Sequence, residues 1–364
     1  MMTRIWLLPL LAGVLLLLAH APAFAPACCP APRFGEAVVN ADQTVIILWD
    51  PATKTEHFIR QASFKSEADD FGFLIPSPSR PELNESGNEA FPYLRKLTEP
   101  EIKKVKAPPQ NVGCGCLPQS RAPQAAVGNA KMEEVRVLEE KLVAGFHASV
   151  LEADSTEVLV TWLKDHGYAY SPEVAAWAKP YVGGDWKITA LKVAKSKEEK
   201  QDKTVAASAL RMTFKTDRPL FPYREPDTRS AAKALEASQR LLRIYFLSDG
   251  RYQGDLTKET PWTGKVAWAG SLNAENRTKM LELLKLPEPT GPADWWLTEF
   301  EDPWPYQLAP ADVYFARDAD QSTVKRPPII EYVSAAWPSD VTAIALVGVL
   351  FVPAIVRRVR RRRA

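Results

Sequence analysis

Two uncharged segments, one near each end of the chain, most constrain what this sequence can fold into. Near the start, Arg4 precedes an apolar run at residues 5–19, and an alanine- and proline-rich stretch follows at residues 20–27. A positive charge, an apolar run and small residues in this order are typical of a secretory signal peptide. We therefore predict a signal peptide over residues 1–25 and export of the rest of the chain.

The second uncharged segment, residues 341–356, predicts a membrane anchor. Its sixteen residues would form a helix of about 24 Å, against a hydrocarbon core of roughly 30 Å. Tryptophan and arginine side chains at its two ends can reach the interfaces and close this gap. The predicted anchor residues are Trp337, Arg357, Arg358, Arg360, Arg361, Arg362 and Arg363.

The arginines also give the anchor a direction, because basic flanks stay in the cytoplasm. We therefore predict a single-pass protein whose body lies outside the cytoplasm. Its C-terminal parts are a juxtamembrane segment at 331–340, the transmembrane helix at 341–356 and a basic cytoplasmic tail at 357–364. A tail of this shape can also be a processed sorting signal, so the sequence leaves open whether the anchor is retained.

The charge between these ends excludes one class of partner. The formal net charge of +2 comes from 46 basic and 44 acidic residues. Seven of the 46 basic residues are Arg4 and the six arginines of the tail, which leaves 39 basic against 44 acidic residues in between. Nucleic-acid binding needs clustered cations on the folded part of a protein. We therefore expect no nucleic-acid partner.

Residues 26–106 have the pattern of a β-rich domain. The β-branched run at Thr44–Trp49 is typical of a strand buried on both faces. Further strands are predicted at His57–Phe64 and Asp70–Ile75, the last ended by Pro76, Pro78 and Pro81, and the three should form an antiparallel meander. A short helix is expected at Glu89–Leu97. Residues 107–130, rich in Pro, Gly, Gln and Ala, are predicted to be a linker.

Residues 131–330 are predicted to form an α+β domain. Residues 134–153 favour a hairpin, and Asp154 with Glu157 predicts a capped helix that ends at Gly167. A second helix should start at Ser171-Pro172 and end before Pro180, and Asn273 or Ser271 should cap a third. Strands are expected at Trp186–Val193, Leu210–Thr216 and Leu241–Ser248. The whole chain is therefore predicted to be α+β, with mostly antiparallel strands and a few short helices.

Four cysteines, Cys28, Cys29, Cys114 and Cys116, form the sharpest group of chemically capable residues. An even number of cysteines in an exported chain favours disulfides. A bridge between the adjacent Cys28 and Cys29 is strained, so each is expected to pair with Cys114 or Cys116. The four thiols can instead bind a soft metal such as Cu(I), or take part in thiol exchange. Lipid attachment to Cys28 is a separate alternative.

Other candidate residues favour structural roles. The histidines His57, His147 and His166 are isolated and predict no metal site. The stretch from Asp318 to Ser322 resembles the start of a calcium loop, but Thr323 stands where the turn glycine belongs. We expect no metal and no cofactor. Several tryptophans favour packing against a sheet, with an aromatic ligand-binding surface as the alternative. These are Trp262, Trp268, Trp295, Trp296 and Trp304.

Several segments in a fixed order resemble a bacterial family of unknown function, DUF2330. They include Cys28-Cys29, VVNADQTVIILWD, FGFLIPSPSRPEL, VTWLKDHGYAY, YVGGDWKITALKV and LRMTFKTDRPLFPYREP. The resemblance covers most of residues 28–320. It implies an exported, commonly membrane-anchored envelope protein, and it supplies no catalytic residues. The expected location is the bacterial cytoplasmic (inner) membrane.

The function that these patterns favour is a noncatalytic binding or scaffolding module of the cell envelope. We expect contact with the membrane through the C-terminal helix and with an unknown envelope protein or glycan ligand. The alternative is an extracytoplasmic thiol-disulfide oxidoreductase or copper-handling protein that uses the four cysteines. No nucleophile, base or metal triad is visible in the sequence, so we assign no catalytic residue.

Overall fold

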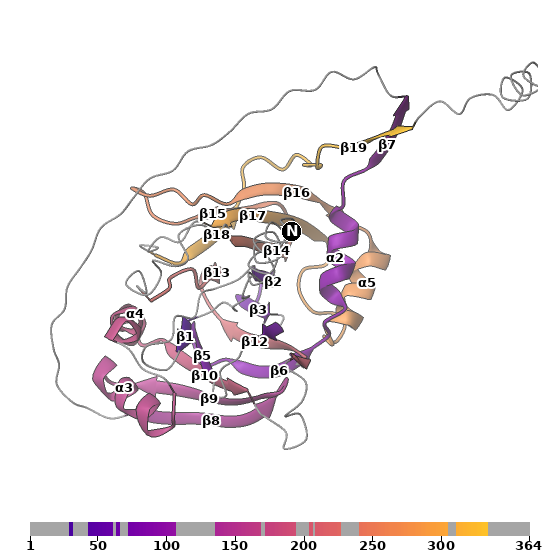
Figure 1. Ribbon diagram of the computed structural model, residues 1–364. Helices are drawn as coiled ribbons and strands as arrows, with labels where there is room; N and C mark the ends of the chain where they lie inside the picture. Colours follow the sequence, from indigo (N-terminus) through magenta and orange to yellow (C-terminus); the bar gives the residue numbers. More distant parts are fainter. Residues whose placement is uncertain are drawn as a thin grey trace, which may run out of the picture. The chain divides into compact units, whose positions relative to one another are not determined.

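The computed structural model describes residues 29–31, 43–60, 63–65, 72–106, 135–168, 172–193, 204–206, 208–226, 240–304 and 311–333 (Figure 1). The predicted signal peptide, linker, transmembrane helix and basic tail lie outside these residues. No helix within the described ranges is long and apolar enough to cross a membrane.

The chain divides into two compact units. Unit 1 comprises residues 1–99 and 122–325, and unit 2 comprises residues 100–121 and 326–364. The described part of unit 2 is a parallel two-stranded sheet of β7 (Ile102–Lys106) and β19 (Ile329–Val333).

A seven-stranded sheet in the order β16-β17-β14-β2-β3-β12-β6 organises unit 1. Its strands are β2 (Gln43–Asp50), β3 (Thr55–Arg60), β6 (Glu82–Ser86), β12 (Ala209–Lys215), β14 (Arg240–Ser248), β16 (Lys265–Leu272) and β17 (Trp295–Trp304). All neighbours are antiparallel except β14 and β2. Strands from before and after the predicted linker therefore share one sheet.

Strand β2 lies inside this sheet, and its sequence explains why. Val45 and Ile47 point into one apolar cluster, while Ile46 and Leu48 point into another on the opposite face. All four side chains are fully buried. The predicted strand with two buried faces is therefore confirmed, because successive side chains alternate between the faces of a sheet.

Two helices cover one face of the seven-stranded sheet (Figure 1). They are α2 (Ala90–Thr98), which contributes Phe91 and Leu94, and α5 (Ala274–Leu283), which contributes Met280 and Leu281. The tryptophans of the neighbouring strands, Trp268 and Trp295, pack into the same cluster.

Two smaller sheets pack on the other face. A five-stranded antiparallel sheet has the order β1-β5-β10-β9-β8, and a three-stranded sheet has the order β13-β18-β15. The strands are β1 (Cys29–Ala31), β5 (Gly72–Ser77), β8 (Val135–Val143), β9 (Phe146–Ala153), β10 (Lys187–Val193), β13 (Leu220–Phe221), β15 (Tyr252–Asp255) and β18 (Val313–Arg317). A separate two-stranded sheet pairs β4 (Ser63–Lys65) with β11 (Thr204–Ala206).

Helices α3 (Thr156–Asp165) and α4 (Pro172–Val182) pack in one apolar cluster with side chains of the five-stranded sheet. The described part of unit 1 is thus layered as helices, sheet, sheets and helices. The predicted α+β class, with mostly antiparallel strands and a few short helices, is confirmed. Four helices are seen within the described ranges.

Several local predictions are confirmed. The hairpin of β8 and β9 turns at Ala144 and Gly145, whose φ angles are 53° and 81°. Asn273 caps α5 by accepting a hydrogen bond from the backbone N–H of Asn276. Gly167 follows α3 with a φ of 68°, a conformation that glycine adopts without strain.

Two helix boundaries differ from the predictions. The N-cap of α3 is Ser155, not Asp154, and its hydroxyl accepts a hydrogen bond from the N–H of Val158. Helix α4 does not end before Pro180 but runs through it to Val182. Tyr181 and Val182 are buried in the cluster beneath α4, so tertiary packing offsets the helix-breaking tendency of the proline.

The predicted three-stranded meander is confirmed for its first two strands, β2 and β3, and is wrong for the third, β5. Strand β3 pairs with β2 and β12, whereas β5 pairs with β1 and β10 in a different sheet. The strand ends at Ser77, before the predicted Pro78, while Pro76 lies within it, opposite Ile188. Strand β1 pairs only as far as Leu74, so the missing N–H of Pro76 interrupts no ladder on that side.

Candidate functional site

The last described residues of unit 1 form a segment that we call the C-terminal strap, residues 318–325. It follows β18, and the register of β18 against β15 decides where it starts. Tyr252 pairs with Arg317, so Arg251 and Asp318 stand side by side at the end of the ladder. The N–H of Asp318 donates to the carbonyl of Arg251 at 2.9 Å.

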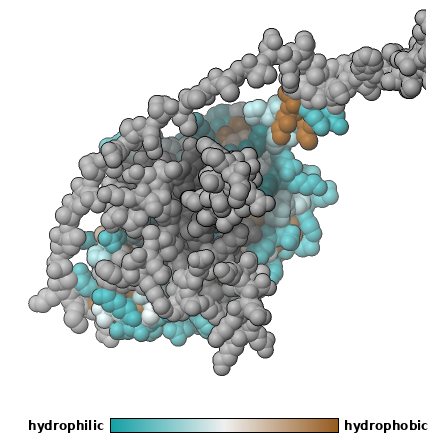
Figure 2. All heavy atoms as spheres, in the orientation of Figure 1, coloured by the Kyte–Doolittle hydropathy of each residue, from teal (hydrophilic) through white to brown (hydrophobic). Residues whose placement is uncertain are grey.

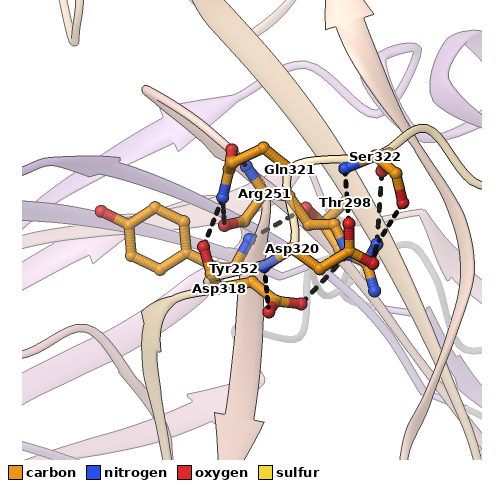
Figure 3. A network of polar contacts seen from close by, with 7 residues as sticks. All are labelled: Arg251, Tyr252, Thr298, Asp318, Asp320, Gln321 and Ser322. Carbon is orange, nitrogen blue, oxygen red and sulfur yellow. Dashed lines mark hydrogen bonds and ion pairs between the residues drawn. The ribbon is translucent and has the colours of Figure 1, made fainter.

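Figure 3 shows the side chains of the strap gathered around Arg251. The guanidinium lies 3.2 Å from Asp318 Oδ2 through Nε and 2.8 Å from Asp320 Oδ2 through Nη1. Nη1 also lies 3.3 Å from the hydroxyl and the carbonyl oxygen of Ser322. The side chains of Arg251 and Asp318 are each 13% exposed, so this ion pair is largely shielded from solvent.

Hydrogen bonds within the strap hold its shape. Asp318 Oδ1 accepts from the N–H of Asp320, and Asp320 Oδ1 accepts from the N–H of Ser322. Gln321 joins the strap to Arg251, because its Oε1 accepts from the Arg251 N–H and its Nε2 donates to the Arg251 carbonyl. Hydrogen bonds from Ser322, and then the charge of Arg251, hold the pKa of Asp320 below its usual value.

This geometry shows which group the carboxylates of the calcium-like spacing face. The two carboxylates that a cation would attract face the guanidinium of Arg251. The positive charge is therefore supplied by the chain itself. Among the described residues, no group of three or more acidic, histidine or cysteine side chains could hold a metal ion.

The end of the strap is attached to the seven-stranded sheet. Val324 forms an antiparallel bridge with Ala269 of β16, with two backbone hydrogen bonds of 2.9 Å. The ammonium of Lys325 lies 4.9 Å from the centroid of the Trp268 ring, a distance suited to a cation–π contact. The body is thus attached to the strap at two places before the chain continues into unit 2.

A second polar group is buried between the sheets around Asp302, which is 1% exposed. Its Oδ2 accepts from the Tyr223 hydroxyl at 2.8 Å and from the Trp262 Nε1–H at 2.9 Å. Its Oδ1 accepts from the Thr263 hydroxyl at 2.6 Å. Burial, and then the charge of Asp302, raises the pKa of Tyr223. Both oxygens of this carboxylate are occupied by donors of the chain.

Asp312 connects other elements in the same way. Its Oδ1 accepts from the Tyr181 hydroxyl of α4 and from the N–H groups of Tyr223 and Arg224. Burial raises the pKa of Asp312. The arrangement ties α4 to the segment after β13 and to the start of β18, which is a structural role.

Strand β3 carries three buried ionisable residues in a short stretch. Burial raises the pKa of Glu56 well above its usual value. Its Oε2 accepts from the Leu220 N–H, and its Oε1 has no hydrogen-bond partner among the described residues. Burial, and then the charge of Arg211, lowers the pKa of His57 to about 4. Burial also lowers the pKa of Arg60 to about 9, and its guanidinium lies 5.4 Å from the Phe73 ring centroid.

The structure describes only part of the predicted site residues. Cys29 lies in β1, where its backbone pairs with Leu74. The remaining cysteines and the anchor residues lie outside the described residues, so the disulfide, copper and anchor interpretations stay predictions. These residues are Cys28, Cys114, Cys116, Trp337, Arg357, Arg358, Arg360, Arg361, Arg362 and Arg363.

The tryptophans and histidines have mostly structural surroundings. Trp268 and Trp295 are 6% and 2% exposed, which favours packing for these two residues over an aromatic ligand-binding surface. Trp262 lies partly buried beside Asp302 and Phe300. His57 is within hydrogen-bonding distance of the Thr213 hydroxyl, and the ring of His166 stacks on Trp162.

Arg251 and Asp302 were not identified from the sequence. Arg251 lies about 70 positions from its partners in the strap, and Asp302 lies about 80 and 40 positions from Tyr223 and Trp262. Residues this far apart in the sequence form no local pattern from which their contact could be predicted. The only signal in the sequence was the resemblance of Asp318–Ser322 to the start of a calcium loop, from which no site was predicted.

Together these features define an α+β protein of stacked, mostly antiparallel sheets whose buried charges are held by other parts of the same chain. Residues 22–325 match the DUF2330 family, described as "Uncharacterized protein conserved in bacteria". The match covers more than half of the sequence, and the chain belongs to this family.

Two solved structures are similar over most of the chain, at low scores. The crystal structure of baculovirus P35 has 8% identity and a TM-score of 0.34, covering 83% of this chain and 100% of that one. A mutated baculovirus P35 after caspase cleavage has 8% identity and a TM-score of 0.31, covering 79% and 100%. Scores this low support no conclusion about fold or function. Among curated proteins, none matches the chain significantly.

Proposed function

We propose that this DUF2330 protein is a single-pass, membrane-anchored extracytoplasmic protein of the bacterial cell envelope. Its body serves as a noncatalytic binding or scaffolding module at the cytoplasmic membrane. The observation that carries the proposal is the uncharged segment at 341–356 followed by six arginines, because a basic flank after a span keeps the C-terminus in the cytoplasm.

The C-terminal strap supports an anchored body. It fastens unit 1 through Arg251 and through the Val324–Ala269 bridge shortly before the predicted anchor. A membrane anchor that follows the strap can hold the body only if the strap is attached to the sheets of unit 1. The carboxylate of Asp302 supports a noncatalytic body, because donors of the chain already bind both of its oxygens.

An open groove between α2 and α5 is the surface that we propose for a partner. It has a volume of about 650 Å³. Its walls combine an aromatic ring with acidic, basic and hydroxyl groups, a mixture that suits a polar ligand such as a glycan or an envelope protein. The lining residues are Tyr93, Ala274, Glu275, Thr278, Lys279 and Glu282.

The topology is tested with the full chain in bacterial spheroplasts. Added protease should digest the body but leave a C-terminal epitope tag intact, and carbonate washing should not release the chain. The matched control replaces the six tail arginines with serine, which should weaken the orientation and expose the tag in part of the molecules. A protected body with a digested C-terminus would show that the orientation is reversed.

A further inference from the structure

The β7–β19 sheet exposes apolar side chains that the fold of unit 2 does not cover. Ile102 is 64% exposed, Ile329 54% and Ile330 41%. Figure 2 shows apolar (brown) spheres beside hydrophilic (teal) ones at the place where Figure 1 draws this sheet. Parallel sheets are normally covered on both faces, and isolated two-stranded sheets are marginal in water. A partner surface for this sheet is therefore expected.

The strand register sorts these side chains onto two faces. Ile102 pairs with Ile329, and Lys104 pairs with Glu331. Residues paired across a sheet share a face, and the residues two positions along return to it. One face therefore combines the two most exposed isoleucines with Lys104 and Glu331. The other face carries Ile330 next to Lys103.

The surroundings of the sheet are basic. In residues 100–106 and 326–333, four cations stand against two acids. Lys103 and Lys104 are exposed, and Lys104 lies 3.7 Å from Glu331 Oε2. Isoleucines flanked by lysines on an open surface match the chemistry of a membrane interface with anionic headgroups.

The length of the remaining chain limits how far this sheet can lie from the membrane. Val333 ends β19, and the predicted span begins at residue 341. Eight residue steps reach at most about 29 Å when fully extended. If the anchor at 341–356 spans the bilayer, β19 is held within this distance of the lipid headgroups.

We propose that the β7–β19 sheet docks on the outer surface of the membrane that holds the anchor, with anionic phospholipid as its partner. Ile102 and Ile329 reach the boundary between headgroups and acyl chains, while Lys104 on the same face contacts the headgroups. The open backbone edges stay at headgroup depth, where water can hydrogen-bond to them, as hydrocarbon cannot. This inference rests on the proposed membrane anchor.

The test uses the full chain in vesicles of phosphatidylcholine, with and without phosphatidylglycerol. Ile329 is replaced by the photoreactive residue benzoylphenylalanine, and lipid adducts are counted by mass spectrometry after irradiation. Adducts should form and should increase with phosphatidylglycerol. K104Q should lower the yield about fivefold, because one basic residue near an anionic surface contributes about that factor. K103Q is the matched control and should have a smaller effect, because Lys103 lies on the opposite face with Ile330.

Two control sites make the test specific. The same photoreactive residue at Thr260, an exposed loop position of unit 1, should give no lipid adduct. At position 330, on the opposite face, the yield should be lower than at 329. Adducts at 329 between two protein chains, without lipid adducts, would show that the sheet pairs with a second copy and would overturn the proposal.

Carbonate washing separates this inference from the proposed function. A chain that resists carbonate but gives no lipid adduct at 329 is anchored without docking, and only the docking inference fails. A chain that carbonate releases, yet gives adducts that depend on phosphatidylglycerol, docks without the anchor. A released chain without adducts contradicts both.

Discussion

The described residues include two parallel strand pairs in opposite surroundings. In unit 1, β2 and β14 lie side by side in the seven-stranded sheet, with Val45 paired to Ile244 and Ile47 paired to Phe246. These four side chains are buried. In unit 2, β7 and β19 pair Ile102 with Ile329, and both isoleucines are mostly exposed.

The difference shows what a parallel pair needs. The β2–β14 pair is covered by α2 and α5 on one face and by further sheets on the other. The β7–β19 pair has similar aliphatic residues but no such cover among the described residues of unit 2. Aliphatic strands gain stability only when apolar area leaves water, so the second pair depends on a surface outside the unit.

The largest expected effect is in the buried pair. Ile46→Ala removes a fully buried side chain beneath α2 and α5, and should lower the free energy of unfolding by about 2–5 kcal/mol. Chemical denaturation measures this change. If Ile46→Ala lowered the free energy of unfolding no more than a surface substitution does, the contrast between the buried and the exposed pair would be wrong.

The next largest loss of stability is expected at Asp302. Its carboxylate lies beside the buried β2–β14 pair, since Asp302 is opposite Leu242 of β14. Asp302→Ala leaves the donors of Tyr223, Trp262 and Thr263 without their acceptor. The expected loss of stability is about 2–4 kcal/mol. Tyr223→Phe removes one donor and should cost about 1 kcal/mol. A double-mutant cycle that shows no coupling between the two positions would contradict this account.

The strap marks the transition from the buried to the exposed region. Arg251→Ala removes the cation that holds Asp318 and Asp320, and should cost about 1–2 kcal/mol. Hydrogen exchange at residues 318–325 should become faster, while exchange in β2 stays slow. Arg251→Lys keeps the charge but loses the fork of donors, so its effect should be intermediate. Unchanged exchange in the strap would show that Arg251 does not hold it.

A pH experiment tests how strongly unit 1 excludes water next to β2, because Glu56 pairs with Trp49. Burial raises the pKa of Glu56, so the folded state holds the proton more tightly than the unfolded state. Stability is then lost as pH rises from the ordinary value of 4.5 toward the raised pKa. Glu56→Gln should match the native chain at pH 4 and exceed it by about 1 kcal/mol at neutral pH.

His57 changes the stability with pH in the opposite direction to Glu56, and its contribution is the same in both chains. Its folded pKa of about 4 lies below the ordinary 6.5, so stability is lost as pH falls from 6.5 toward 4. This contribution is present in both chains and cancels in their difference. A constant difference between Glu56→Gln and the native chain from pH 4 to neutral pH would show that Glu56 is not held protonated.

The smallest expected effect on stability is in the exposed pair. Ile329→Ala should change the free energy of unfolding by no more than about 0.5 kcal/mol, because the side chain is already 54% exposed. Its effect should appear instead in lipid contact, measured as a lower photo-adduct yield at position 102. A destabilisation as large as that of Ile46→Ala would show that Ile329 is covered by the protein itself.

Much of the local structure was predictable because its causes are local. The run at Thr44–Trp49 predicts a strand buried on both faces, and Asn273 and Gly167 mark helix ends through their own backbone preferences. The predicted meander failed at its third strand, because β5 takes its partner β10 more than a hundred positions away. Strand pairing over such distances leaves no periodic signal in the sequence.

By itself, the sequence determined the class of fold, most of the elements and the uncharged segments at both ends, because propensity and hydrophobic periodicity act between near neighbours. Only the tertiary structure decided that Arg251 supplies the charge for Asp318 and Asp320, and that Tyr223 and Trp262 meet at Asp302. It also decided that one parallel pair is buried and the other exposed. These outcomes depend on which surfaces meet in space, and burial then sets the cost of every charge and aliphatic group at those surfaces.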